Sequence, residues 1–105
     1  NKQLEVIFLT HGREGSRAYL RGQGEVAHKA GFAVESIDTT GAGDAFVAGS
    51  LVNIMAQMDA GKTLATLDYA ALLQFANATG ALATLNRGGI PGLPTYAQVQ
   101  NFLTE

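Results

Sequence analysis

The first third of the chain alternates short apolar runs with turn residues. Residues 4–10 (Leu-Glu-Val-Ile-Phe-Leu-Thr) form an apolar run that ends at the polar residues 11–15, which is typical of a buried strand followed by a glycine-containing turn. The group Ala18-Tyr19-Leu20 predicts a return strand within residues 16–21. Residues 22–36 hold Gly, Val and Phe in short groups and predict one or two further short strands.

After Ile37 the pattern changes to that of a loop followed by helices. Residues 38–44 predict a polar, glycine-bearing loop, and residues 45–58 predict a helix that Gly61 closes with a left-handed cap. A second helix is expected from residue 67 or 68 to residue 86, with Asp68 as its N-cap. Its apolar stripe consists of Leu72, Phe75, Ala76, Thr79, Leu82 and Ala83.

The last segments complete a single unit. Residues 87–94 contain three glycines and two prolines and predict a loop. Thr95 followed by Gln98 fits a capping box that opens a last short helix, which we expect to end near residue 103. Because no internal repeat or linker interrupts the sequence, residues 1–105 are expected to form one unit.

Composition excludes several classes of function. The chain is 47% hydrophobic and 15% charged, with 7 Lys+Arg against 9 Asp+Glu. That weak acidity offers no basic surface for nucleic acid, and no segment is apolar enough for a membrane span. With no cysteine, disulfides and thiolate metal sites are excluded. The sequence begins at Asn1 without an export leader, so we expect a processed chain or a piece of a longer one, located in the cytoplasm.

Charge is distributed unevenly along the chain. Ten charged side chains lie in the first 38 residues and six in the remaining 67, with none between Asp44 and Asp59 or between Asp68 and Arg87. Helices that are apolar on most sides are usually covered on most sides, and a chain this small has difficulty covering two of them alone. We therefore expect another segment or subunit to cover them, and we expect Met55 and Met58 to fill a core.

The loop at residues 38–44 combines features that suit phosphoryl transfer. Gly41 and Gly43 allow close approach of the backbone, and the N–H groups and positive dipole end of the following helix favour an anion such as a phosphoryl group. A carboxylate at Asp44 would repel that phosphate, so it is better explained as a base that accepts the proton of an attacking hydroxyl.

A simpler interpretation competes with this one. Asp44 could merely be an acid favoured near a helix N-terminus, with the glycines forming a turn, and an arbitrary Gly-x-Gly-Asp favours that interpretation. The loop is not a P-loop, because no Gly-Lys-Ser/Thr follows it. Asn77 could likewise be a buried amide that neighbouring backbone groups satisfy. His11 and His28 lack further ligands at metal spacing.

The contiguous block Asp38-Thr39-Thr40-Gly41-Ala42-Gly43-Asp44-Ala45-Phe46 resembles the second signature of the ribokinase-like (PfkB) carbohydrate kinases. Residues 10–15 (Thr-His-Gly-Arg-Glu-Gly) resemble the upstream nucleotide segment of that family. Residues 75–83 and 90–95 are most similar to bacterial fructokinases within it. The resemblance covers essentially the whole chain and implies an α/β fold, namely the C-terminal portion of a ribokinase-like, Rossmann-type layered fold with strands and then helices packed on a sheet.

The resemblance also implies roles for individual residues. Asp44 would be the general base, and the backbone of Gly41, Ala42 and Gly43 would form the anion hole. The ATP phosphates and ribose would contact Thr10, Gly12 and Gly15, and Asn77 would lie near the adenine. Asp38 and Thr40 match positions that in several members help to hold a monovalent cation such as K⁺, and ATP chemistry implies Mg²⁺.

The resemblance leaves the partners and the substrate partly open. The N-terminal part of the family fold and its lid, which grip the sugar, are expected to come from outside these residues, and a homodimer stays open. The favoured hypothesis is an ATP-dependent sugar kinase of fructokinase type. A ribokinase or an aminoimidazole riboside or nucleoside kinase is the alternative within the family. A non-catalytic nucleotide-binding module is the alternative from another class.

Overall fold

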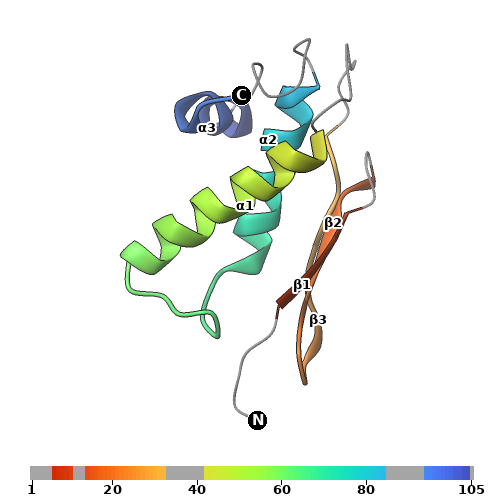
Figure 1. Ribbon diagram of the computed structural model, residues 1–105, viewed down its shortest axis with the longest axis vertical. Coiled ribbons are helices and arrows are strands. Elements are labelled where there is room, and N and C mark those ends of the chain that lie inside the picture. The colour runs from red at the N-terminus through yellow and green to blue at the C-terminus, as the bar shows by residue number, and fades with distance from the viewer. Residues whose placement is uncertain (1–5, 11–13, 33–41, 85–93, 105) are drawn as a thin grey trace.

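The computed structural model describes residues 6–10, 14–32, 42–84 and 94–104, which form an antiparallel sheet with helices on one side (Figure 1). The elements follow the chain as three strands and then three helices: β1 (Val6–Thr10), β2 (Ser16–Leu20), β3 (Gly24–Lys29), α1 (Ala42–Asp59), α2 (Tyr69–Ala83) and α3 (Tyr96–Thr104). The strands lie within the predicted segments. The α/β class expected from the sequence is therefore confirmed.

The strands pair in sequence order as β1-β2-β3, and both pairs are antiparallel. Thr10 at the end of β1 pairs with Ser16 at the start of β2, and Ser16 also pairs with Lys29 at the end of β3. The β2–β3 hairpin turns at Gly22 and Gly24, whose φ angles of +85° and +78° suit glycine. This pairing brings the ends of β1 and β3 to the start of β2.

Local capping signals place the ends of the helices. The Asp68 carboxylate accepts a hydrogen bond from the N–H of Ala71 at 3.0 Å, as expected for an N-cap. Thr95 and Gln98 exchange two hydrogen bonds of 2.8 and 3.1 Å, which confirms the capping box. Gly61 follows α1 with a φ of +97°, so the predicted left-handed cap is also confirmed.

Two predicted helix boundaries need correction. α1 begins at Ala42 and not at Ala45, because the last residues of the predicted loop already adopt helical backbone angles. α2 ends at Ala83, where Thr84 caps it and its N–H contacts the carbonyl oxygens of Gly80 and Ala81. The predicted end at residue 86 lies outside the described residues.

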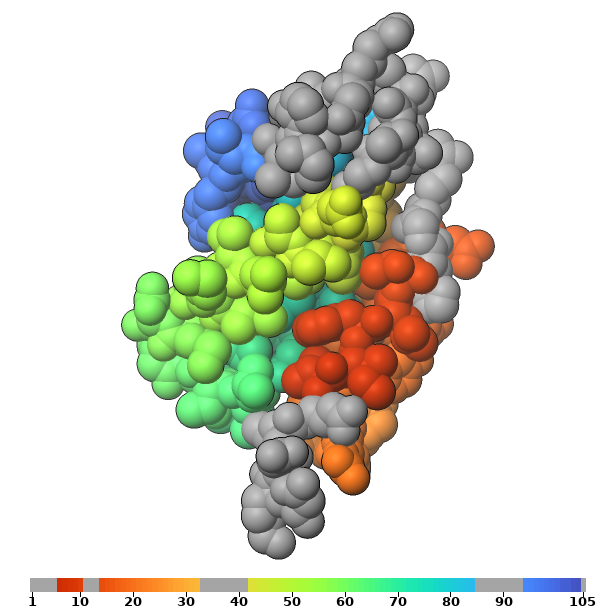
Figure 2. Space-filling model, in the orientation of Figure 1, coloured from red at the N-terminus to blue at the C-terminus, as the bar shows by residue number. Residues whose placement is uncertain are grey.

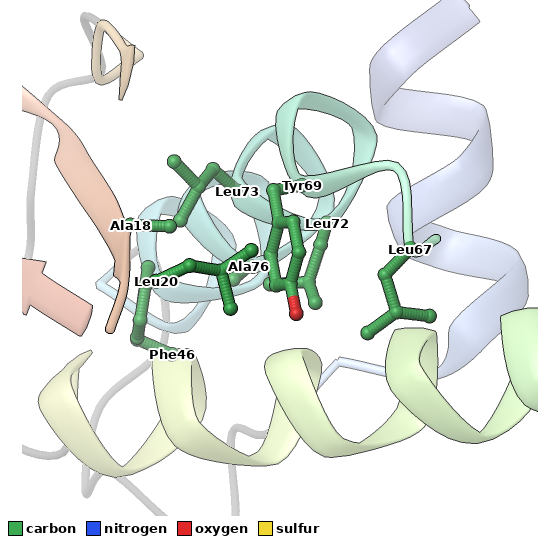
Figure 3. Close-up of a cluster of buried hydrophobic side chains, with 8 residues drawn as sticks. All are labelled: Ala18, Leu20, Phe46, Leu67, Tyr69, Leu72, Leu73 and Ala76. Atoms are coloured by element: carbon green, nitrogen blue, oxygen red, sulfur yellow. The ribbon is translucent and has the colours of Figure 1, made fainter. Parts of the chain in front are cut away.

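α2 is the centre of the packing because it contacts both α1 and the sheet (Figure 3). Leu72 and Leu73 are fully buried, and they meet Phe46 from α1 and the β2 side chains Ala18 and Leu20. Burying one such leucine contributes about 1.5–3 kcal/mol to the free energy of folding.

The Tyr69 hydroxyl donates a 2.6 Å hydrogen bond to the carbonyl of Leu64, and burial raises the pKa of this tyrosine.

The crossing of α1 over α2 depends on a glycine. A Cβ at Gly49 would lie 2.6 Å from Thr79 Oγ1 and 3.3 Å from the Cα of Ala76. Further along the same pair, a Cβ at Gly80 would lie 3.3 Å from the carbonyl oxygen of Ala42. Small residues therefore let the two helices approach closely, and they hold the first turn of α1 against the C-terminal half of α2.

The side of α1 that faces away from α2 carries exposed apolar side chains. We call Val47, Leu51, Met55 and Met58 the outer stripe of α1, and they are 56%, 55%, 66% and 47% exposed. The described part of this chain therefore does not cover Met55 and Met58, and the expectation that they fill a core with another segment stays a prediction. On β1, Ile7 and Leu9 are also about half exposed. Among the described helices, none combines the length and apolar character that a membrane span needs.

Candidate functional site

Asp44 lies in the first turn of α1 with an exposed side chain. The first N–H groups of a helix have no partner within the helix, and the helix dipole makes this end positive. Gly43 beside it is exposed, and no atom lies within 4 Å of the position that a Cβ would occupy. The turn thus offers an accessible carboxylate next to backbone that an anion can approach.

Thr10 and Gly43 border one open hollow between β1 and α1. In Figure 2, β1 (red) and α1 (yellow to green) lie side by side on one face of the molecule, with part of α2 visible between them. The hollow has a volume of about 330 Å³. Its walls are mainly apolar and consist of Phe8, Thr10, Gly43, Phe46, Val47, Ser50, Leu51 and Ile54. One residue of the predicted nucleotide segment and one of the predicted anion hole therefore lie at the same opening.

Gly15 and Asn77 meet at a second place, the junction of β2, β3 and α2. Gly15 is buried with a φ of +110°, and a Cβ there would lie 2.0 Å from the carbonyl oxygen of Lys29. The Asn77 amide accepts a 2.8 Å hydrogen bond from the Ser16 hydroxyl and donates to the carbonyl of Lys29 at 3.2 Å and to that of Ala30 at 3.3 Å. Gly15 and Asn77 thus both contact the short segment at residues 29–30.

α2 connects these two places. Asn77 and Gly80 are three residues apart, so they lie on the same side of α2 one turn from each other. Asn77 bonds the ends of β2 and β3, whereas Gly80 lies against the first turn of α1. The first turn of α1 and the strand ends are therefore brought to one end of the molecule by a single helix (Figure 1).

Several predicted site residues fall outside the described part of the chain. These are Gly12, Asp38, Thr40 and Gly41, so their roles in the nucleotide site, the cation site and the anion hole stay predictions. Within residues 6–10, 14–32, 42–84 and 94–104, no group of three or more His, Asp or Glu side chains could hold a metal ion.

Sequence reasoning missed two features of the site. The first is the hydrogen bond from Ser16 to Asn77, for which the only local signal is a small polar residue directly after a glycine at the start of a strand. The second feature is the helix face on which Asp44 lies. The outer stripe of α1 follows Asp44 by 3, 7, 11 and 14 positions, at Val47, Leu51, Met55 and Met58. At 3.6 residues per turn, Asp44 and the outer stripe of α1 share one face of the helix.

Comparison with known proteins is consistent across sequence and structure. The family model described as pfkB family carbohydrate kinase matches residues 1–96. Fructokinase-2 of Oryza sativa subsp. japonica is 39% identical over 103 residues, which are 97% of this chain and 29% of the rice protein. The chain thus spans less than a third of the length of the curated relatives it matches.

Solved structures give the same picture. The fructokinase of Vibrio cholerae O395, bound to fructose, ADP and calcium ion, has a TM-score of 0.73 and 36% sequence identity, with 93% of this chain and 30% of that chain covered. The ribokinase of Arabidopsis thaliana, complexed with ribose and ATP, has a TM-score of 0.75 and 29% identity, with coverage of 95% and 29%. Both similarities extend over nearly all of the chain.

Proposed function

The chain belongs to the pfkB family of carbohydrate kinases, and from that premise we propose that it is the nucleotide-binding and catalytic part of an ATP-dependent sugar kinase. The observation that carries the proposal is the arrangement around α1. The Asp44 carboxylate is exposed on the first turn, and Gly43 borders the same hollow as Thr10 at the end of β1. This arrangement supports a base and an anion seat beside the strand end on which the nucleotide phosphates would lie.

The proposed reaction transfers the γ-phosphoryl group of ATP to a sugar hydroxyl. The hydroxyl oxygen forms a bond to the γ-phosphorus, the bond between that phosphorus and the bridging oxygen breaks, and ADP leaves. The hydroxyl proton passes to the Asp44 carboxylate. The backbone N–H groups of Gly41, Ala42 and Gly43 stabilise the negative charge on the transferred group.

The nucleotide and ions are assigned on the same basis. Thr10, Gly12 and Gly15 would line the phosphates and ribose of ATP. Mg²⁺ carried by the ATP phosphates would neutralise part of their charge. Asp38 and Thr40 would contribute oxygen ligands to a monovalent cation such as K⁺, and a mutant of the Vibrio cholerae fructokinase is described in a potassium-bound form.

The proposal includes the partner that completes the site. We propose that the part of the kinase fold that the relatives have beyond the matched region packs on the outer stripe of α1. The stripe is about half exposed in this chain, and it shares a helix face with Asp44, so a segment covering it also reaches the base. We use "complete kinase" for this chain together with that part of the fold.

The activity is tested with the complete kinase and a panel of acceptors: fructose, ribose and aminoimidazole riboside. We expect ATP-dependent formation of a phosphosugar, with the highest kcat/KM for fructose, because the rice and Vibrio cholerae relatives are fructokinases. A strong preference for aminoimidazole riboside over fructose would instead support the alternative within the family, a riboside kinase. ATP binding without turnover of any acceptor would support a non-catalytic nucleotide-binding module.

The covering of the outer stripe is tested by introducing a charge. Leu51→Lys should abolish the recovery of soluble, active complete kinase, because burying an unpaired ammonium group against apolar side chains costs several kcal/mol. Ala97→Lys adds the same charge at an exposed position of α3 and should leave yield and kcat/KM unchanged. Equal behaviour of the two variants contradicts the proposed packing. If the complete kinase dimerises in a concentration-dependent way and Leu51→Lys abolishes the dimer, the outer stripe packs instead against a second copy of the chain.

A further inference from the structure

The side-chain amide of Asn77 makes three hydrogen bonds within the chain, which engage both of its donors and one lone pair of its oxygen. Its oxygen accepts the 2.8 Å hydrogen bond from Ser16, and its nitrogen lies 3.2 and 3.3 Å from the carbonyl oxygens of Lys29 and Ala30. A primary amide has two N–H donors, so each donor has a backbone carbonyl within reach. An adenine contact through these donors would require one of the bonds to break.

These bonds join segments that are far apart in the sequence. Ser16 is 61 residues from Asn77, and Lys29 and Ala30 are 48 and 47 residues from it. Ser16 is fully buried, so no water competes for its hydroxyl proton. A single side chain on α2 therefore fixes the start of β2 and the end of β3 relative to the helix.

The fixed segment is also the one on which Gly15 packs. A Cβ at Gly15 would lie 2.0 Å from the carbonyl oxygen of Lys29 and 2.8 Å from both the Cα of Ala30 and the nitrogen of Gly31. The backbone of Gly15 thus rests directly against residues 29–31. Any movement of that segment changes the space in which the Gly15 backbone lies.

We infer that Asn77 is a positioning residue of the nucleotide site, which acts through Ser16 and the backbone of residues 29–30 to hold the backbone of Gly15, and that it does not read the adenine base. This inference rests on the proposed function, because that proposal places the ATP phosphates and ribose against Thr10 and Gly15. It gives the expectation that Asn77 lies near the adenine a specific form, in which Asn77 acts on the position of Gly15 and not on the base.

The test measures steady-state kinetics of the complete kinase with ATP and with GTP. Asn77→Ala should raise KM for ATP and KM for GTP by the same factor, about tenfold, with kcat changed less than about twofold, because the backbone of Gly15 is displaced whichever base is bound. Ser16→Ala removes one donor and keeps the bonds between α2 and β3, so it should raise both KM values about threefold. The double variant Ser16→Ala/Asn77→Ala should have nearly the same KM values as Asn77→Ala alone, because the two residues act as a unit.

The matched control is Gln74→Ala, which removes an exposed amide from the same helix and should leave both KM values unchanged. Amide hydrogen exchange gives an independent readout: Asn77→Ala and Ser16→Ala should speed exchange at residues 14–16 and 29–32, and Gln74→Ala should not. If Asn77→Ala does not fold, Ser16→Ala carries the same two readouts by itself.

The outcomes separate the inference from the proposed function. The inference would be overturned if Asn77→Ala lost the preference for ATP over GTP while Ser16→Ala left both KM values unchanged. Asn77 would then contact the adenine base. Faster exchange without any change in KM would also overturn the inference, because the bonds would then serve stability alone. Absence of ATP turnover in the unsubstituted complete kinase is a failure of the proposed function, and it is recognised before any variant is compared.

Discussion

Asp44→Asn is expected to lower kcat of the complete kinase by about 10²–10⁴-fold, the usual contribution of a positioned general base. Asparagine keeps the size and place of the side chain on the first turn of α1 but cannot accept the hydroxyl proton. The affinity for ATP should persist or rise slightly, because the substitution removes a negative charge close to the proposed phosphate seat. Steady-state kinetics together with ATP titration by calorimetry measures both effects.

The matched control is Asp59→Asn at the other end of α1. Asp59 is also an exposed carboxylate on this helix, and we expect its replacement to leave kcat unchanged. If Asp44→Asn retains the turnover of the unsubstituted kinase, Asp44 is not the base, and the simpler role of an acid favoured at a helix N-terminus remains. If both kcat and ATP affinity collapse, the substitution has disturbed the first turn itself.

The features that the sequence predicted correctly depend on a few neighbouring residues. The N-cap at Asp68 acts over three positions, the capping box joins Thr95 to Gln98, and the cap at Gly61 depends on one backbone angle. The sequence predicts the start of α1 three residues too late, because Gly and Asp, the residue types at positions 43 and 44, are common in loops. Packing of Gly80 against Ala42 stabilises helical structure there, and this contact cannot be read from the local sequence.

The arrangement of the site depends on distant residues, and the sequence predicted less of it. The block at residues 38–46 pointed to Asp44 and the glycines, but nothing in it indicates that Thr10 borders the same hollow as Gly43. The bond from Ser16 to Asn77 spans 61 residues, and an amide in a charge-free helix gave no sign of its partner. Met55 is an apolar residue of the kind that fills cores, yet it is exposed in this chain. The residue type alone does not show which segment packs against it.

Gly15→Ala is expected to lower the free energy of unfolding by about 3 kcal/mol or more. Two costs add: a side chain at a φ of +110° is strained by about 1–3 kcal/mol, and overpacking costs a similar amount. The added Cβ meets the carbonyl oxygen of Lys29 at 2.0 Å, and backbone cannot rotate away as a flexible side chain could. Urea denaturation of the complete kinase, with and without the substitution, measures the difference in the free energy of unfolding.

Gly22→Ala separates the two costs. Gly22 also has a positive φ, +85°, but nothing lies within 4 Å of its Cβ position, so only the backbone strain of about 1–2 kcal/mol applies. The difference between the two variants then isolates the packing of Gly15 on residues 29–31. Combining Gly15→Ala with Asn77→Ala should cost less than the sum of the single changes, because a segment released from Asn77 can move away from the new methyl group. Simple additivity would show that Asn77 does not hold the segment against which Gly15 rests.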